Sequence, residues 1–399
     1  MEAVAEHIKV PELRFPEFSG EWNGQRLGEF IKVNPPDMPL PNSFYYIDLD
    51  AVDKGILKDA EKTSLESAPS RAQRFLEVGD VLFQMVRPYQ KNNLWFREKT
   101  GEYVASTGYA VLRSKCQSFT YQLLHTPQFN NHVRVRCTGS SYPAINTSEL
   151  RLIPVQFPSL PEQQKIAEFL TTVDEKIGKL KRKKELLEAY KKGAMQKLFS
   201  QEIRFKDDQG NPYPDWEEKR LGDCLFERSE KTSVNNQFEV LSSTAKGLFR
   251  QEEYFNRQIA SKENIGYKIL RKNQVVLSPQ NLWLGNINLN QNFEIGIVSP
   301  SYKIFEISSE VHQGYLGPYL RIPRMFYEYA QASEQGASVV RRNLDSDLFS
   351  QIAINIPSLP EQQKIAEFLT GIDDKIKAVA NQIDQAAEFK KGLLQKMFV

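Results

Sequence analysis

The stretch PSLPEQQKIAEFLT occurs twice in this chain, from Pro158 to Thr171 and again from Pro357 to Thr370. The second copy begins 199 residues after the first, in a chain of 399 residues. Similarity continues at the same offset. TVDEKI at 172–177 is matched by GIDDKI at 371–376, and KKGAMQKLF at 191–199 by KKGLLQKMF at 390–398. Solenoid units are only a few tens of residues long. This repeat therefore predicts a duplicated half-protein.

Each copy predicts one long helix. Ser159 and Glu162 have the spacing of a capping box, and Pro161 lies in the first turn, where its missing N–H costs nothing. The second copy repeats the arrangement with Ser358, Pro360 and Glu361. The predicted helices begin where the repeat begins.

An apolar seam in alternating steps of four and three residues runs along both predicted helices. Its apolar members are Ile166, Leu170, Val173, Ile177, Leu180 and Leu187 in the first copy, and Ile365, Leu369, Ile372, Ile376, Val379 and Ile383 in the second. An ordinary amphipathic helix would pack on its own domain and have a wider apolar face. A narrow seam kept in register in both copies instead predicts a coiled coil.

The composition allows folded cores but shows no global charge. Hydrophobic residues make up 40% of the chain and aromatic residues 11%, and 399 residues are enough for two to three domains. The net charge is only +2. A surface that binds nucleic acid would therefore have to be a local patch.

The cysteines and histidines do not predict a metal site or a disulfide framework. Three cysteines and four histidines are scattered along the chain, without ligand spacing. The first residues lack the apolar segment of a signal peptide, and no run approaches 18 apolar residues. We expect a cytoplasmic protein that does not contact a membrane and binds no cofactor or metal.

The repeat divides the chain into four parts. We predict a first globular domain at 1–157, a helix at 158–200, a second domain at 201–356 and a helix at 357–399. Residues 45–52, 80–86 and 109–114 have strand-like patterns, and 119–135 has a helical one. In the second domain the segments VLSSTAKGLF, QVVLSP, GNINL and SYKIFEI predict strands and turns. Two similar domains with different interiors are expected to perform one task on two targets.

Helix length favours antiparallel pairing. A helix of about 38 residues is roughly 57 Å long, whereas a domain of this size is about 40 Å across. Parallel pairing would require the second domain to begin at one end of the pair and finish at the other. We therefore expect an α+β protein in which two similar α/β domains are joined by an antiparallel coiled coil with pseudo-twofold symmetry.

Two segments are similar to catalytic motifs but lack features that those motifs require. Asn34-Pro35-Pro36-Asp37 is similar to a signature of amino-methyltransferases, but its fourth residue is not aromatic and cannot stack on a base. No glycine pair has the G-x-G spacing of a cofactor loop. Asp215, Glu217 and Lys219 imitate a nuclease motif, but the two acids are adjacent in one turn. We expect no catalytic residue.

Clusters of arginine, lysine and amide side chains are the candidates for nucleic-acid recognition. Arginine and lysine bind guanine edges or phosphates, and asparagine and glutamine bind adenine. The candidates in the first domain are Arg71, Arg74, Arg87, Lys91, Asn92, Asn93, Arg134, Arg136, Ser140, Ser141 and Tyr142. Those in the second domain are Lys246, Arg250, Gln280, Asn281, Arg341 and Arg342.

With these parts together, the whole chain resembles the specificity subunit of type I restriction-modification systems. The features that carry the resemblance are IPSLPEQQKIAEFL at 356–369, with Phe157 in place of Ile356 in the first copy, the KKG-x-x-QK-x-F helix ends, the RLG openings at 26–28 and 220–222, and the run SRAQRFLEVGDVLFQMVRPY at 70–89.

The resemblance implies a non-catalytic DNA-recognition subunit. Each domain would recognise one half of a bipartite target in double-stranded DNA, and the helices would bind two methyltransferase subunits. Those subunits would carry S-adenosylmethionine, and motor-nuclease subunits would join for restriction. The resemblance does not imply which bases are recognised.

Two other classes of function remain open. One is a stand-alone adenine methyltransferase, which the missing glycine-rich cofactor loop opposes. The other is a coiled-coil scaffold with two ligand-binding heads. Salt-dependent binding to DNA would separate recognition of nucleic acid from the scaffold, because phosphate contacts release counterions.

Overall fold

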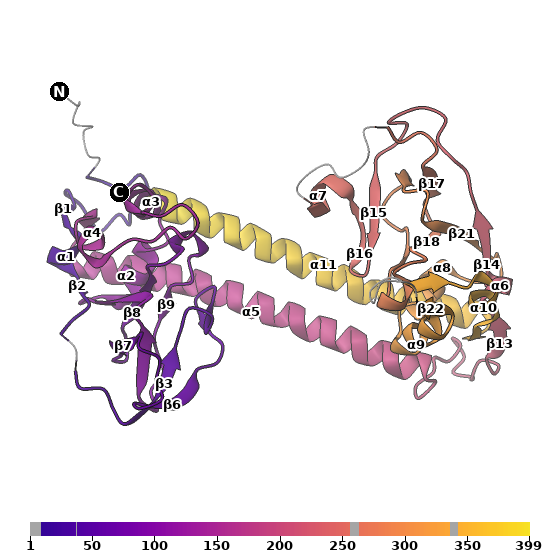
Figure 1. Ribbon diagram of the computed structural model, residues 1–399, viewed down its shortest axis with the longest axis horizontal. Helices are drawn as coiled ribbons and strands as arrows, with labels where there is room; N and C mark the ends of the chain where they lie inside the picture. Colours follow the sequence, from indigo (N-terminus) through magenta and orange to yellow (C-terminus); the bar gives the residue numbers. More distant parts are fainter. Residues whose placement is uncertain (1–8, 37, 256–262, 336–341) are drawn as a thin grey trace. The chain divides into compact units, whose positions relative to one another are not determined.

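The computed structural model describes residues 9–36, 38–255, 263–335 and 342–399. The chain forms two compact units (Figure 1). The first contains residues 1–182 and 380–399, and the second contains residues 183–379. Each unit therefore combines one globular head with part of each of the two long helices, α5 (Leu160–Phe199) and α11 (Leu359–Lys396).

The first head has two four-stranded sheets with strand orders β6-β3-β10-β7 and β2-β11-β8-β9. The short pair β1-β12 closes it before α5. Its strands are β1 (Asn23–Arg26), β2 (Lys32–Val33), β3 (Ser43–Ile47), β4 (Val52–Asp53), β5 (Ile56–Leu57), β6 (Glu61–Ser64), β7 (Ala72–Phe75), β8 (Val81–Gln84), β9 (Leu94–Trp95), β10 (Tyr103–Ser106), β11 (Tyr109–Arg113) and β12 (Pro154–Phe157). Its helices are α1 (Leu27–Phe30), η1 (Pro88–Gln90), α2 (Gln117–Leu123), α3 (Pro127–Arg136) and α4 (Thr147–Arg151).

The second head is built around the sheet β14-β21-β18-β19. Its strands are β13 (Glu217–Arg220), β14 (Leu225–Arg228), β15 (Leu241–Thr244), β16 (Gly247–Arg250), β17 (Lys268–Arg271), β18 (Val275–Leu277), β19 (Ile287–Leu289), β20 (Ile295–Val298), β21 (Lys303–Ile307), β22 (Ser333–Gln335), β23 (Arg342–Leu344) and β24 (Ala353–Ile356). Its helices are α6 (Leu221–Cys224), α7 (Gln251–Phe255), η2 (Leu282–Leu284), α8 (Gln313–Tyr319), α9 (Pro323–Gln331) and α10 (Ser346–Gln351).

The two heads share a central sheet and a closing strand pair. The sheet β2-β11-β8-β9 corresponds to β14-β21-β18-β19, and the pair β1-β12 corresponds to β13-β24. A parallel pairing of β3 with β10 is matched by a parallel bridge between Val240 and Ile297. The predicted duplication of an α+β fold is therefore present in three dimensions.

One predicted element divides into two. The predicted helical stretch at 119–135 is helical for most of its length, in two helices, α2 and α3, with a short break between them. Pro127 occupies the first position of α3, and the Thr126 side chain accepts a hydrogen bond from Phe129 N. A proline with an N-cap threonine before it starts a helix, because the proline has no N–H to continue the preceding one.

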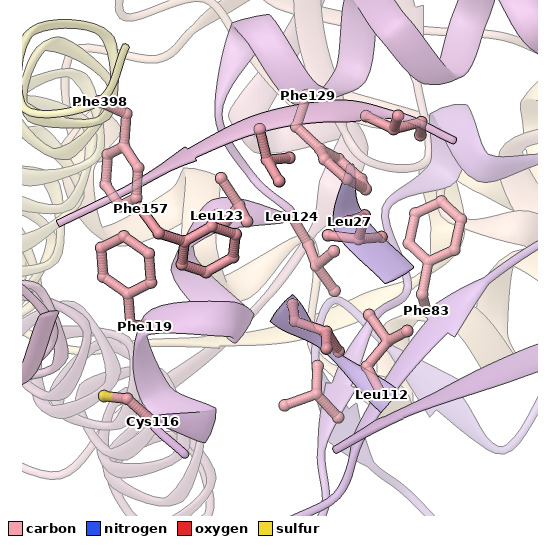
Figure 2. Packing of buried hydrophobic residues seen from close by; sticks show 14 of the residues in the cluster. Leu27, Phe83, Leu112, Cys116, Phe119, Leu123, Leu124, Phe129, Phe157 and Phe398 are labelled. Carbon is pink, nitrogen blue, oxygen red and sulfur yellow. The ribbon is translucent and has the colours of Figure 1, made fainter. Parts of the chain in front are cut away.

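The core of the first head extends to the end of the chain. Phe119, Leu123 and Phe157 belong to the same core as Phe398, which follows the last turn of α11 (Figure 2). The rings of Phe119 and Phe398 stack with centroids 5.2 Å apart. In the second unit, Phe199 at the end of α5 meets Tyr315 and Tyr319 edge-on. Each head therefore takes its last aromatic core residue from a helix end.

The two helices pair in antiparallel fashion within each unit. In the first unit Asp174 forms an ion pair with Lys390 at 2.7 Å, and the earlier residue Leu170 shares a core with the later Phe398. In the second unit Lys191 pairs with Asp373 at 2.6 Å, while Phe199 shares a core with Ile365. Advancing along α5 thus means going back along α11, as helix length predicted.

The predicted seam residues lie on the covered side of the helices. Each is buried or half-buried: Ile166, Leu170, Ile365, Leu369, Ile372 and Val379 are buried, and Val173, Ile177, Leu180, Leu187, Ile376 and Ile383 are half-buried. Lys191 and Lys390 occupy seam positions as well and pair with the aspartates of the other helix. Such polar pairs inside a seam specify which register forms.

The glutamate of the repeated motif does not cap its own helix. Glu162 accepts hydrogen bonds from Arg14 Nε at 2.7 Å, Arg14 Nη2 at 2.8 Å and Trp22 Nε1 at 3.3 Å. Its side chain is 2% exposed. We call Arg14, Trp22 and Glu162 the Glu162 cluster. It ties the first turn of α5 to the opening segment of the head.

The second unit repeats this arrangement. Glu361 accepts from Arg204 Nε at 3.1 Å, Arg204 Nη2 at 2.8 Å and Trp216 Nε1 at 3.0 Å. These three residues form the Glu361 cluster. Ser358 Oγ is buried without a hydrogen-bond partner. The predicted capping box of the second helix is therefore wrong, because its carboxylate is bound by the head instead.

Of the helices in the described residues, none is both long enough and apolar enough to cross a membrane.

Candidate nucleic-acid interface

The loop from β8 to β9 is the centre of the candidate site in the first head. It is joined by backbone hydrogen bonds to the segment between α3 and α4. Arg87 N donates to Pro143 O at 2.8 Å, and Ile145 N donates to Met85 O at 3.0 Å. At the start of the loop, Met85 N donates to Gly108 O at 2.9 Å. Two segments far apart in the sequence thus form one surface.

This surface brings together members of the two polar groups predicted for the first head. The Arg87 guanidinium lies over the Tyr142 ring, 4.3 Å from its centroid. Tyr142 is 61% exposed, and the neighbouring Ser140 and Ser141 are exposed. Such a cation–π contact holds an arginine in place without neutralising its charge.

Both ends of η1 have unusual backbone conformations. Arg87 has φ 53° and Lys91 has φ 56°, in the left-handed region. Residues other than glycine enter this region at a cost of about 1–3 kcal/mol each, and such strain gathers at functional sites. The exposed Lys91 and the half-buried Arg87 are the cations at the two ends of this turn.

The amide side chains of this loop build it rather than face outward. Gln84 N donates to Asn93 Oδ1 at 3.0 Å, and Asn92 N donates to Gln84 Oε1 at 3.1 Å. Asn93 is 1% exposed. The prediction that Asn93 contacts DNA is therefore wrong, because the side chain is buried and has a structural role. Asn92 is half-buried and its Oδ1 accepts from Lys54 N at 3.0 Å.

The hydrogen bond between Lys54 and Asn92 identifies Lys54 as a candidate that sequence analysis missed. Lys54 is exposed at the turn between β4 and β5, next to the loop. Lys246 is exposed at the corresponding turn of the second head. Both are followed by glycine, so the repeated Lys-Gly turn was the available signal.

The other cations of the first head differ in their position. Thr107 N donates to Arg71 O at 2.8 Å, so exposed Arg71 lies beside the Gly108 end of the loop. Arg74 lies on β7, in the other sheet, and lines a small cavity with Asn34 and Arg113. The structure does not bring Arg74 into the loop surface.

The last turn of α3 contributes Arg134 and Arg136. Arg134 is exposed. Arg136 is half-buried, donates to His132 O at 3.0 Å and lies 4.0 Å from Glu149. Arg134 is thus the better placed of the two to meet a phosphate.

The second head repeats the arginine–aromatic contact with its partners exchanged. Here the aromatic residue, Trp283, lies on the loop from β18 to β19, and the arginine lies on β23. Arg342 is 4.4 Å from the Trp283 ring centroid, and its N–H donates to Gln280 O at 3.2 Å. Gln280 is exposed and Asn281 is half-buried. Arg341 lies outside the described residues.

Arg321 joins two parts of this surface. Its Nη1 donates to Ile287 O and to Asn288 Oδ1, both at 2.7 Å, and its Nη2 donates to Ala245 O at 2.7 Å. Burial lowers the pKa of Arg321. These hydrogen bonds hold the turn that carries Lys246 against β19. Arg321 therefore positions Lys246, a candidate DNA contact, and is not itself a candidate.

Arg250 is exposed, and carboxylates surround its guanidinium. Its guanidinium lies 2.7 Å from Glu239 and 3.3 Å from Glu253, and the hydrogen bond to Glu239 is the main cause of its raised pKa. Two carboxylates offset its charge. Arg250 therefore adds little attraction for a phosphate, and its role is to join β16 to neighbouring segments.

The rejected catalytic motifs have structural roles. Asn34 has φ 48°, its Oδ1 accepts from Val111 N and its Nδ2 donates to Thr147 Oγ1. These bonds leave its amide committed within the head. Lys219 lies on β13 and pairs with Glu310 at 2.8 Å. Asp37 lies outside the described residues.

One protein family matches both halves of the chain. The family described as the type I restriction modification DNA specificity domain matches residues 77–189 and 213–388. This chain belongs to that family. Each matched stretch contains the loop after the central strand and most of a long helix, whereas Lys54, Arg71 and Arg74 lie before the first stretch.

Two relatives from Methanocaldococcus jannaschii are similar in sequence. One, provisionally named the type I restriction enzyme MjaX specificity subunit, is 25% identical over 285 residues, which are 69% of this chain and 65% of that protein. This chain thus spans slightly less than two thirds of it. The type I restriction enzyme MjaVIII specificity subunit is 22% identical over 424 aligned positions, covering 96% of this chain and 92% of that protein.

Solved structures share the fold. A chain from a study of complex assembly and conformational transition in the type I R-M system superposes with a TM-score of 0.58 at 19% identity, covering 94% of this chain and 96% of that one. The type I restriction-modification S subunit from M. genitalium gives 0.54 at 14% identity, with coverage of 98% and 99%. The specificity-domain fold is therefore retained at low identity.

Proposed function

We propose that this chain recognises a bipartite sequence in double-stranded DNA, with each head reading one half. The observation that carries the proposal is the repeated surface at the end of the central strands β8 and β18. In both heads it presents an arginine held on an aromatic ring beside exposed polar side chains. The loops differ in sequence while the strands beneath them correspond, which suits two readers of different half-sites.

The residues we propose for DNA contact are divided between phosphates and bases. Exposed Lys54, Lys91, Arg134 and Lys246 are suited to phosphates. Arg87 and Arg342 are held by stacking, and a fixed arginine can bind guanine through two hydrogen bonds. Gln280 and Asn281 are the candidates for adenine.

We further propose that the helices bind two methyltransferase subunits, with motor-nuclease subunits joining for restriction. Leu186 and Tyr190 on α5 are 54% and 57% exposed, and Phe389 on α11 is 56% exposed. Exposed apolar side chains on a helix are suited to packing against another subunit. In this assignment the partners hold S-adenosylmethionine and perform methylation, and this chain supplies recognition alone.

Selection of bound duplexes from a random-sequence pool tests the proposal. The full-length chain with its methyltransferase partner should enrich one motif made of two short blocks separated by unread positions. Affinity for that motif should fall linearly with the logarithm of salt concentration, because each neutralised phosphate releases counterions. Enrichment of no motif, or binding indifferent to salt, would exclude the proposal.

Exchange of one head is the sharper version of the test. Residues 201–356 would be replaced by the corresponding head of a relative, leaving the first head unchanged. One block of the selected motif should change and the other should persist. A change in both blocks would show that the heads do not read independently.

The alternatives make different predictions. A stand-alone adenine methyltransferase would bind S-adenosylmethionine as an isolated chain, which calorimetry would detect. A scaffold with two ligand-binding heads would leave duplex DNA unbound at low salt. The surfaces of both heads favour DNA over these alternatives because they combine cations with hydrogen-bonding amides.

A further inference from the structure

The η1 turn of the first head presents an exposed aromatic ring that phosphate and base-edge contacts do not explain. Tyr89 is the middle residue of η1 and is 63% exposed. The preceding residue, Pro88, is buried and anchors the turn in the head. A ring directed outward from an anchored turn has no packing role within the head.

The turn that carries Tyr89 is held rigidly. Gln90 N donates to Arg87 O and Lys91 N donates to Pro88 O, both at 3.0 Å. Gln84 Nε2 donates to Gln90 Oε1 at 2.8 Å. A side chain on such a turn loses little backbone entropy when it binds, so its contacts are not offset by ordering the loop.

Charge around Tyr89 favours a polyanion. Arg87 lies two residues before it and Lys91 two residues after it, and both have left-handed backbone at the two ends of the turn. Arg87 is held against Tyr142 rather than against a carboxylate. An exposed ring between two cations is therefore presented toward a negatively charged surface with flat, stackable groups.

The second head has an apolar residue at the same turn. Leu284 ends η2 and is 45% exposed. Gly285, with φ 86°, follows it, and a Cβ at this position would lie 3.0 Å from the Phe326 ring, so this turn lies close to α9. Two heads with different loops both keep an exposed apolar side chain beside the stacked arginine.

We infer that Tyr89 inserts between adjacent base pairs of the bound duplex, acting as a wedge that unstacks one step. The inference rests on the proposed function. Apolar side chains inserted in this way kink DNA and allow more protein surface to be reached. Leu284 would act at the other half-site. Lys91 would hold a phosphate beside the step opened by Tyr89, and Arg87 would contact a base next to that step.

Fluorescence of 2-aminopurine tests the wedge. The probe is the duplex selected by the full-length chain, with 2-aminopurine placed at each position of the first half-site in turn. We expect binding of the unaltered protein to raise the fluorescence several-fold at one step, because unstacking relieves quenching. Tyr89→Ala should abolish the increase, whereas Tyr89→Phe should keep it.

Two controls separate insertion from general damage. Leu65→Ala removes another exposed apolar side chain of the same head, 44% exposed, and should retain the increase. Tyr89→Ala should leave the salt dependence of binding unchanged, since it removes no charge. An equal increase in Tyr89→Ala, or no increase with the unaltered protein on a duplex that it binds, would overturn the wedge and leave the proposed function standing. Failure to bind any duplex would overturn the proposed function itself.

Discussion

Replacing Glu361 with glutamine should loosen the start of α11 from the second head. The Glu361 carboxylate is fully buried and accepts three hydrogen bonds, two from Arg204 and one from Trp216. Glutamine keeps the shape but carries an NH₂ group that faces donors instead of accepting from them. It also leaves the Arg204 guanidinium without its buried counter-charge.

The size of the effect follows from these contacts. Hydrogen bonds to a charged group are worth about 1.5–3 kcal/mol each, and breaking a buried ion pair by removing one partner costs about 3–5 kcal/mol. The Arg204 side chain is 22% exposed and keeps bonds to Tyr213 O and Pro214 O, so water and these carbonyls recover part of the loss. We therefore expect about 3 kcal/mol for Glu361→Gln.

Hydrogen exchange measured by mass spectrometry is the suitable assay, because it resolves the two units in one chain. A loss of about 3 kcal/mol should speed exchange of the amides in the first turns of α11 about 100-fold. The matched control is Glu162→Gln, which should produce the same change at the start of α5 and leave α11 as it was. Unchanged exchange near Glu361 in its own variant would refute the argument that this buried pair holds the helix to the head.

The remaining predictions concern the helix seam, the two stacked arginines and one histidine. Ile376→Asp places a charge at a half-buried position of the seam. It should weaken helix pairing in the second unit by about 2 kcal/mol or more while both heads stay folded. Thermal unfolding followed by hydrogen exchange would show this. Arg87→Ala should weaken binding to the selected duplex about 10-fold or more and relax sequence preference at one position of the first half-site. Arg342→Ala should have the same effect at the second half-site. Loss of affinity without relaxed sequence preference would show that the arginine contacts a phosphate. Burial lowers the pKa of His125 from 6.5 to about 4, so the folded state favours the neutral imidazole. The free energy of unfolding should therefore fall by about 1 kcal/mol between pH 7 and pH 5.5, as the unfolded chain gains a proton on this residue. His125→Gln should remove that part of the pH dependence in urea unfolding.

The architecture was predictable because its signals are local or repeated. The duplicated stretch at 158–171 and 357–370 identifies two equivalent halves without any knowledge of contacts. Apolar spacing along the helices depends only on the 3.5-residue period of a coiled coil. The direction of pairing followed from length, since only antiparallel helices let a compact head connect them.

The roles of individual polar residues could not be predicted in the same way. Glu162 has the spacing of a capping residue, yet its partner Arg14 is 148 positions away. Asn93 looks like a surface side chain in the sequence, but the fold buries it and its Oδ1 accepts from Gln84 N. A polar side chain takes whichever partner the fold brings within hydrogen-bonding distance, and local sequence does not contain that information.

The candidate site shows both sides of this division. By itself the sequence determined that each half carries arginine, lysine and amide groups after a central strand and again before the long helix. Only the tertiary structure decided that these groups meet, with Arg87 on Tyr142 in one head and Arg342 on Trp283 in the other. The exchange of partners leaves no common motif, because a cation–π contact requires a ring and a cation at one place and is indifferent to which segment supplies either.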